Sequence, residues 1–431
     1  MKAKAAFRPP VENPLIESLT RACVPLLLKG MFHDLRVTFR PDDLRRLGEL
    51  RGERMLLLPN HPSTEDPITM FELARQLGEP MHYVAAREVF DFDHGVRGWL
   101  FQRCGVYSVI RGAPDRESFR MTRQILTRGS RRLVIFVEGE ISYRNDILIP
   151  FQQGVLQLAL SAQEDVCEQF ESAPPVYVAP VAIRYFYAPG VEAAMRQSVE
   201  RLEEALGLET PDSEVSGSDA FGDSSAACGE ASTGLFRRIV AIGERIVGMQ
   251  EALMRLSGEG KTMNERVSQL KNKLLAKMEH YLELETPSGE NPLDRVRAIR
   301  NRMDKVLYAY DDPDGLCAYE REGIQGRSRA FAEFYDDLDR VVNFMTYKEE
   351  DFTAKSPSER FVEMIYRLEK EVFGERRLSH PRTAAIQIGE CEDLRARMPQ
   401  WQASRKQAVA DLCRSLEADM RALLQTAQPP G

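Results

Sequence analysis

A histidine and an aspartate stand five residues apart directly after an apolar run, and this spacing constrains the chain more than any other feature. The run Met55 to Leu58 predicts a buried β-strand, and a polar stretch, Asn-His-Pro-Ser-Thr-Glu-Asp, follows it. In open α/β sheets the chemistry lies just beyond the strand ends. Imidazole titrates near neutral pH, so a histidine at this position can take a proton from a hydroxyl, and Asp66 can fix the tautomer of His61. Because residues five apart do not share a helix face, the chain has to turn between them.

Three further blocks follow this pair in order along the chain. They are Gly105 to Gly112, which ends an apolar strand with Arg111, then Phe136 to Ser142, which follows the strand Leu133 to Phe136, and Val178 to Ile183, an apolar strand broken by proline. Alone, the histidine and aspartate fit a capped turn in any α/β protein as well as they fit an active site. Four blocks in a fixed order are far more specific.

The ordered set resembles the glycerophospholipid acyltransferase superfamily, which includes the lysophosphatidic acid and glycerol-3-phosphate acyltransferases. That family shows Asn-His-x4-Asp, a glycine block ending in arginine, Phe-Pro-Glu-Gly-Thr-Arg-Ser and a Val-x-Pro-Val strand. The matching blocks span Met55 to Tyr187, under half of the 431 residues. The resemblance implies an α/β acyltransferase domain with a mixed, partly parallel sheet flanked by helices.

The resemblance also implies a reaction, an O-acyl transfer like that of the 1-acylglycerol-3-phosphate acyltransferases. His61 would be the general base on the acceptor hydroxyl, with Asp66 orienting it. The oxygen would attack an acyl thioester directly, so no acyl-enzyme is needed. The donor would be acyl-CoA or acyl carrier protein, acting as co-substrate with no separate cofactor. The acceptor would be lysophosphatidic acid or another lysophospholipid or glycerol phosphate.

The substrate-binding residues implied by the resemblance come from three of the blocks. Arg111 would hold the acceptor's phosphate, because a guanidinium offers a planar fork of donors and stays charged. Asn60 would bind substrate, and Glu138 would bind the acceptor or order the loop. Gly139 would let the backbone come close to the substrate.

The third block departs from the family pattern. Its arginine is replaced by Ile141, and Glu140 adds a second carboxylate, whose negative charge disfavours the binding of a phosphate. Arg144, three residues beyond, is the candidate to supply the missing phosphate contact. Two alternatives therefore stay open: an acyltransferase for a phosphate-free alcohol, and an interaction protein that keeps the fold with weakened catalysis.

Composition narrows the class of protein further. The net charge is −8 and neither half of the chain is strongly basic, which excludes a broad nucleic-acid footprint. Seven cysteines without Cys-x-x-Cys spacing indicate reduced cytoplasmic thiols, and the scattered histidines predict no metal site. We find neither a signal-peptide region nor an apolar run long enough to span a bilayer. The expected place is the cytoplasm, with peripheral contact at the inner face of the membrane.

The segment Pro14 to Phe32 predicts an amphipathic helix, which is a candidate for the peripheral contact with the membrane. Its apolar stripe consists of Leu15, Leu19, Cys23, Leu26 and Leu27. Such a stripe is compatible with a helix lying in the bilayer interface. It is equally compatible with a helix packed on the sheet.

Three regions are predicted along the chain. Residues 1–190 form the acyltransferase domain, and 191–381 form a mostly helical insertion with a flexible acidic loop at 209–234. Within the insertion, apolar residues at alternating spacings of three and four, on either side of Ser257 to Gly260, predict a helical hairpin. The alternating segment Thr383 to Glu390 is an isolated strand signal, so we expect it to return to the sheet. Residues 382–431 would thus complete the acyltransferase domain with this strand and carboxy-terminal helices.

Overall fold

The computed structural model describes residues 7–110, 115–129, 131–208, 225–285, 291–307, 317–345 and 347–429. The chain divides into two compact units. The first comprises Met1–Phe186, Arg300–Arg329 and Arg382–Gly431, and the second Tyr187–Ile299 and Ala330–Pro381. The chain therefore leaves the first unit after β6 and returns to it at β7. This division differs from the predicted one at Arg300–Arg329, which groups with the first unit.

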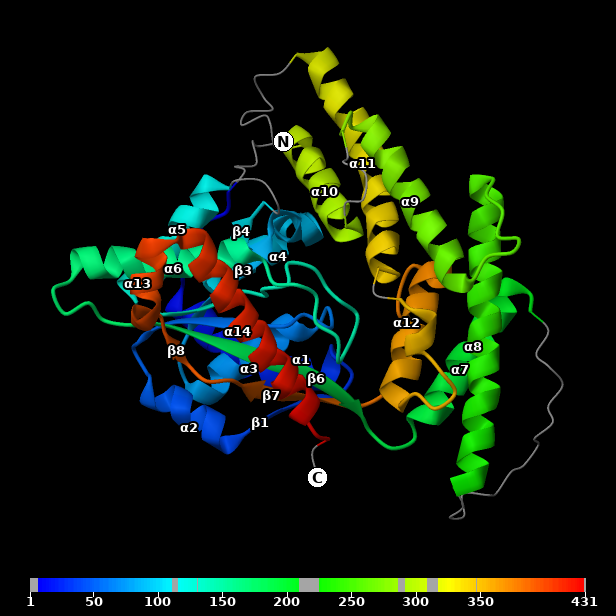
Figure 1. Ribbon diagram of the computed structural model, residues 1–431, viewed down its shortest axis with the longest axis horizontal. Helices are drawn as coiled ribbons and strands as arrows, with labels where there is room; N and C mark the ends of the chain where they lie inside the picture. The colour runs from blue at the N-terminus through cyan, green and yellow to red at the C-terminus, as the bar shows by residue number, and fades with distance from the viewer. Residues whose placement is uncertain are drawn as a thin grey trace. The chain divides into compact units, whose positions relative to one another are not determined.

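One sheet forms the centre of the first unit (Figure 1). Its strands are β1 (Leu35–Phe39), β2 (Arg54–Pro59), β3 (Met81–Ala86), β4 (Val106–Val109), β5 (Arg132–Val134), β6 (Val176–Tyr187), β7 (Arg382–Ile388) and β8 (Glu392–Asp393). They are ordered β1-β7-β6-β2-β5-β3-β4, with β8 paired to β6. Strand β2 is parallel to both β5 and β6, whereas β8 is antiparallel to β6. The predicted mixed, partly parallel sheet is confirmed.

The returning strand is also present. Strand β7 pairs in parallel with β1, in a register that places Ile386 opposite Phe39, and its other neighbour is β6. The two ends of the second unit meet, because the Ala188 amide donates to the Pro381 carbonyl at 2.9 Å. The sheet is thus completed by residues that lie about 200 positions beyond β6 in the chain.

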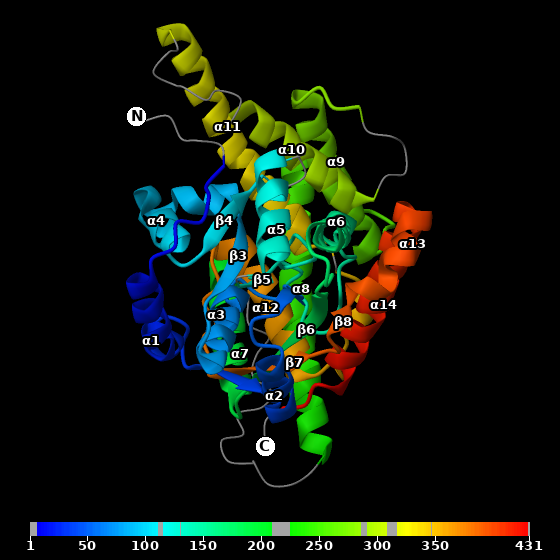
Figure 2. The same cartoon turned by 90° about the vertical axis from the view of Figure 1, so that its left-hand side faces the viewer.

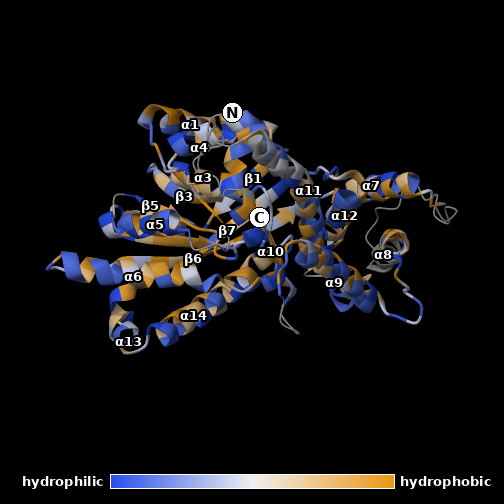
Figure 3. Cartoon of the chain, turned by 90° about the horizontal axis from the view of Figure 1, so that it is seen from above, coloured by the Kyte–Doolittle hydropathy of each residue, from blue (hydrophilic) through white to orange (hydrophobic). Residues whose placement is uncertain are grey.

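Alternate residues of the strands face two separate helical layers. Leu56 and Leu58 of β2 pack against one layer, and Met55 and Leu57 against the other. Because β2 is covered on both faces, its sequence is continuously apolar. The first layer holds α5 (Arg116–Arg128), α6 (Gln153–Gln169), α13 (Met398–Ala403) and α14 (Arg405–Thr426), and the second holds α1 (Pro14–Gly30), α2 (Pro41–Glu49) and α3 (Asp66–Leu77). Figure 3 shows α1 and α3 on one side of the sheet and α6, α13 and α14 on the other.

Short helical elements connect the remaining parts of the first unit. They are η1 (Arg87–Gly95), α4 (Val96–Arg103) and η4 (Leu394–Arg397). Helix α4 lies beside the segment that leads into α1, since the Val11 amide donates to the Gln102 carbonyl at 2.9 Å (Figure 2).

The second unit is helical. It contains α7 (Val191–Leu206), α8 (Ser225–Met254), α9 (Met263–Tyr281), η3 (Glu349–Asp351) and α12 (Ser358–Phe373), while α10 (Pro292–Leu307) and α11 (Ala318–Asn343) have residues in both units. Its core joins the apolar faces of α7, α8 and α12. Glu251 and Arg266 form an ion pair at 2.7 Å between α8 and α9, and Thr262 caps α9. The predicted helical hairpin is confirmed.

The predicted acidic loop at 209–234 is wrong over its last ten positions. Residues 209–224 lie outside the described ranges, but 225–234 form the first turns of α8. This stretch contains three alanines and one glutamate, which have good helix propensity. Once the packed part of α8 has formed, each added residue gains a hydrogen bond without a new nucleation cost.

Candidate active site

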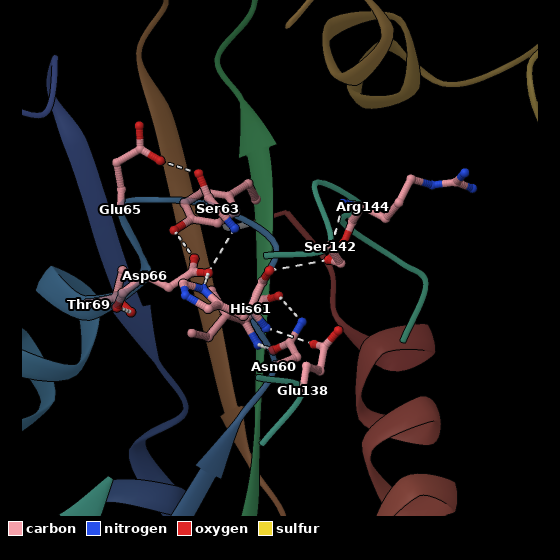
Figure 4. Close-up of polar contacts among 11 residues, drawn as sticks. Asn60, His61, Ser63, Glu65, Asp66, Thr69, Glu138, Ser142 and Arg144 are labelled. Carbon is pink, nitrogen blue, oxygen red and sulfur yellow. Dashed lines mark hydrogen bonds and ion pairs between the residues drawn. The ribbon is translucent and has the colours of Figure 1, made fainter. Parts of the chain in front are cut away.

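The loop between β2 and α3 brings the predicted histidine and aspartate together. Strand β2 ends at Pro59 and α3 begins at Asp66, with Pro67 in the first turn, where a missing amide hydrogen costs nothing. The intervening residues turn the chain back on itself, so that the His61 and Asp66 side chains face each other (Figure 4). The turn required by their spacing is therefore present.

His61 has one ring nitrogen engaged and the other accessible. Its Nδ1 lies 2.7 Å from Asp66 Oδ2, and because a carboxylate only accepts, Nδ1 carries the proton. The ring stacks on Phe136 with centroids 4.3 Å apart. No side chain or backbone group of the described residues bonds to Nε2, and the side chain keeps 16% of its surface exposed. Nε2 is thus the nitrogen that can meet a substrate hydroxyl.

The Asp66 carboxylate has no exposed surface and accepts three hydrogen bonds. Oδ2 accepts from His61 and from the Ser63 amide at 2.8 Å, and Oδ1 accepts from the Tyr185 hydroxyl at 2.6 Å. Burial raises the pKa of Asp66, while the His61, Tyr185 and Ser63 contacts oppose that shift. These donors hold the carboxylate in one orientation toward the imidazole.

Glu138 is fully buried and holds the histidine loop by its backbone. Its two oxygens accept from the amides of His61 at 2.8 Å and Ile149 at 3.0 Å. The Ser142 amide donates to the His61 carbonyl at 2.8 Å, so the third block binds both the amide and the carbonyl of His61 (Figure 4). Burial raises the pKa of Glu138 to about 8, and the negative charge of Asp66 adds to the shift. In this geometry Glu138 orders the loop.

Gly139 forms the turn after Glu138. Its φ of 74° lies in the left-handed region, and a Cβ there would sit 3.1 Å from the Gln152 Cγ. The Gln152 side chain donates to the Glu138 carbonyl at 3.3 Å. The glycine therefore permits both the turn and the close approach of the α6 start.

The two charged residues after Gly139 face different surroundings. Glu140 is buried and forms an ion pair with Arg300 of α10, which is itself buried in the same compact unit. Arg144 is buried too, and its side chain points away from His61 in Figure 4. The extra carboxylate of the third block thus has a cation of its own.

Asn60 uses its side chain to extend the sheet. Its amide donates to the Ile183 carbonyl at 3.1 Å and accepts from the Ile183 amide at 2.7 Å. Asn145 does the same two residues later, with both contacts to Tyr185 at 2.6 Å. Two asparagines therefore replace a neighbouring strand along β6 beyond the end of β2.

Sequence reasoning located part of this site. Asn60, His61, Asp66 and Glu138 come together as the motif order predicted. Arg111 lies outside the described residues. The missed residues are Ser63, Tyr185, Asn145 and Arg300; only Tyr185 carried a signal, as a hydroxyl-bearing residue two positions beyond the predicted strand Val178 to Ile183. Within the described ranges, no group of three or more His, Cys, Asp or Glu residues is arranged to hold a metal ion.

Comparison with known proteins agrees with this geometry. Residues 36–184 match a family model described as Acyltransferase. These residues form an acyltransferase domain of the glycerophospholipid acyltransferase family. The match covers less than half of the chain and contains His61, Asp66 and the third block. Comparison with curated proteins gives no match. The matched residues thus include β2, β5 and most of β6.

We predict that Glu138→Gln makes stability less dependent on pH. The pKa of Glu138 is about 8 in the folded chain, against an ordinary value of 4.5, so the folded state binds this proton more tightly. Its contribution is fully present below the unfolded pKa and is lost as pH rises toward 8, at up to about 1.4 kcal/mol per pH unit. Urea unfolding between about pH 5 and pH 8 measures how the free energy of unfolding of each protein changes with pH. The same pH dependence in wild type and variant would contradict the raised pKa of Glu138.

Proposed function

We propose that this chain transfers a fatty acyl group from acyl-CoA or acyl carrier protein to a hydroxyl of lysophosphatidic acid or a related glycerophosphate. The 2.7 Å contact between His61 Nδ1 and Asp66 Oδ2 carries the proposal. It leaves Nε2 as a base that is oriented and reachable from solvent. The acyltransferase domain around this pair supports the reaction class.

The proposed step needs no group beyond the two substrates and this pair. His61 Nε2 takes the proton of the acceptor hydroxyl while the oxygen attacks the thioester carbonyl carbon. Asp66 offsets the positive charge that forms on the ring. The C–S bond of the tetrahedral intermediate then breaks. The sulfur leaves as a thiol, because it takes the proton back from His61. The acyl group has moved from sulfur to oxygen without a covalent enzyme intermediate.

The acceptor's phosphate is assigned by charge. The Arg300 partner of Glu140 offsets the extra carboxylate of the third block, which would otherwise repel an anion. Because Arg144 points away from His61, we assign the phosphate to Arg111. The isoleucine at position 141 favours a second candidate, the same transfer to an alcohol without a phosphate.

His61→Ala is expected to lower acyl transfer by about two to four orders of magnitude, because it removes the general base. Asp66→Asn should lose less, since the imidazole remains and only its orientation and charge compensation suffer. Labelled acyl donor and a panel of lysolipids measure turnover, with His280→Ala, an exposed histidine on α9, as the control. Retention of more than about a tenth of wild-type turnover by His61→Ala would overturn the mechanism.

Arg111→Ala is expected to raise the Michaelis constant for a phosphorylated acceptor about tenfold or more, because a charge-assisted pair is lost. The constant for the acyl donor should change little. Arg120→Ala, which removes an exposed arginine of α5, is the matched control. An equal effect of Arg111→Ala on phosphorylated and unphosphorylated alcohols would instead support the phosphate-free acceptor.

We also propose that the chain works as a peripheral protein at the inner face of the membrane, docked through a defined apolar surface. Helix α1 packs on the core of the first unit through Val24 and Leu28, and Leu27 of the predicted stripe is partly buried against the same core. Leu15, Leu19 and Leu26 face outward at 82, 66 and 71% exposure. Among the described helices, none is long and apolar enough to cross a bilayer.

Helix α4 adds to this surface. The Asn13 amide, at the start of α1, donates to the Arg103 carbonyl at 3.0 Å, and α4 exposes Val96 and Trp99 nearby. Tryptophan favours the boundary between lipid and water, and several exposed apolar residues on neighbouring helices are unusual for a surface meeting only water. Lys29, in the last turn of α1, is also exposed.

Replacing Leu15, Leu19 and Leu26 together by glutamine is expected to weaken binding to anionic phospholipid vesicles by at least about tenfold, because burying each leucine contributes about 1 kcal/mol or more. Co-sedimentation with the vesicles measures it. Leu253→Gln, at a 76% exposed leucine of α8, controls for general loss of surface apolarity. Equal vesicle binding by the triple variant and the wild type would exclude this surface.

A further inference from the structure

Tyr185 contacts the oxygen of Asp66 that His61 leaves open. Its hydroxyl donates to Oδ1 at 2.6 Å, while His61 binds Oδ2. The ring is buried, and burial together with the charge of Asp66 raises the pKa of Tyr185 well above its ordinary value. The phenol therefore stays protonated and remains a donor throughout the working pH range.

Contacts to the backbone and to the ring of Tyr185 fix where this hydroxyl lies. The Asn145 side chain binds both the amide and the carbonyl of Tyr185, which sets its backbone. The guanidinium of Arg382 lies over the ring face, 4.9 Å from its centroid. Arg382 is held there by an ion pair with Glu65 at 3.0 Å, and Glu65 immediately precedes Asp66 in the chain. A buried phenol needs only a partner for its hydroxyl, whereas this residue is also held by its backbone and by a cation over its ring.

Both residues stand where the chain leaves or re-enters the first unit. Tyr185 lies two positions before the second unit begins, and Arg382 is the first residue after it ends. Strands β6 and β7 are neighbours in the sheet, which brings the two positions together. The departure and the return of the chain therefore both meet the loop that carries the general base.

We propose that Tyr185 and Arg382 are positioning residues for the His61–Asp66 pair. The inference rests on the acyl transfer proposed above. Tyr185 holds the carboxylate so that Oδ2 faces the imidazole, and Arg382 holds the Tyr185 ring. Neither side chain takes or gives a proton in the reaction. The charged groups facing Asp66 and the ring are His61, Glu138, Glu65 and Arg382.

Tyr185→Phe removes one hydroxyl and keeps the ring. We expect kcat to fall about three- to thirtyfold with both Michaelis constants unchanged, because a charge-assisted hydrogen bond to Asp66 is lost. The Tyr185 hydroxyl stabilises the negative charge of the Asp66 carboxylate. Without this hydroxyl, the His61–Asp66 pair binds a proton more readily. The acidic limb of the rate profile should therefore move to higher pH. An NMR titration of the His61 ring should move the same way, and it needs no turnover.

Arg382→Gln tests whether Arg382 acts through the tyrosine. It should lower kcat a few-fold in the wild type and have no further effect in Tyr185→Phe, because that variant has no hydroxyl to place. Equal losses in both backgrounds would overturn the assignment of Arg382.

Tyr83→Phe is the matched control, since Tyr83 is a buried tyrosine of the same core whose hydroxyl donates to the Met70 carbonyl, at 3.4 Å. It should leave kcat and the His61 titration unchanged, and circular dichroism should show all variants folded. An unchanged His61 titration and kcat in Tyr185→Phe would overturn the proposal. A wild type without transfer but with the His61 shift in Tyr185→Phe would contradict the proposed reaction while supporting the positioning role.

Discussion

A buried carboxylate that needs donors on every side explains most of the arrangement around it. Asp66 has no exposed surface, and an ionised carboxylate without partners in such a place would cost several kcal/mol. Its donors come from the ring of His61, the amide of Ser63 and the hydroxyl of Tyr185. Two of these lie in the loop and the third lies in another strand. The site therefore forms only when the loop has closed and β6 is beside β2.

The sheet supplies this neighbour by its pairing. Strand β6 runs alongside β2 as far as Val181, opposite Pro59, and then continues without β2. Beyond that point, the side chains of Asn60 and Asn145 bond to the backbone of Ile183 and Tyr185. On its other side β6 is bordered by β7, which begins with Arg382. The carboxy-terminal segment thus takes part in the site although it lies far from the motifs in the sequence.

The motifs and the strands that carry them were accessible to sequence reasoning. His61 and Asp66 follow a run of apolar residues, and the segment around Ile386 shows a strand pattern among helices, so both could be placed from periodicity. The reach of helix α8 was missed because low apolar content was interpreted as a loop, whereas helix propensity and continuity from the packed part prevailed.

Contacts between distant positions were not accessible in this way. Strand periodicity tells which face Tyr185 occupies, but not that the face meets Asp66. Glu140 and Arg300 are 160 residues apart, and no local pattern links them. Asn60 looked like a substrate ligand because the motif contains it, while its amide is bonded to the backbone of Ile183. Such pairings depend on the register of the sheet and on the path of the returning chain.

The central claim is that Asp66 holds the His61 ring in a single tautomer, with the proton on Nδ1. Nitrogen NMR of the labelled His61 ring near neutral pH tests it directly, because protonated and bare ring nitrogens resonate far apart. The account predicts a proton on Nδ1, a bare Nε2, and loss of this single tautomer in Asp66→Asn. A proton on Nε2 in the wild type, or a ring that exchanges freely between tautomers, would contradict it.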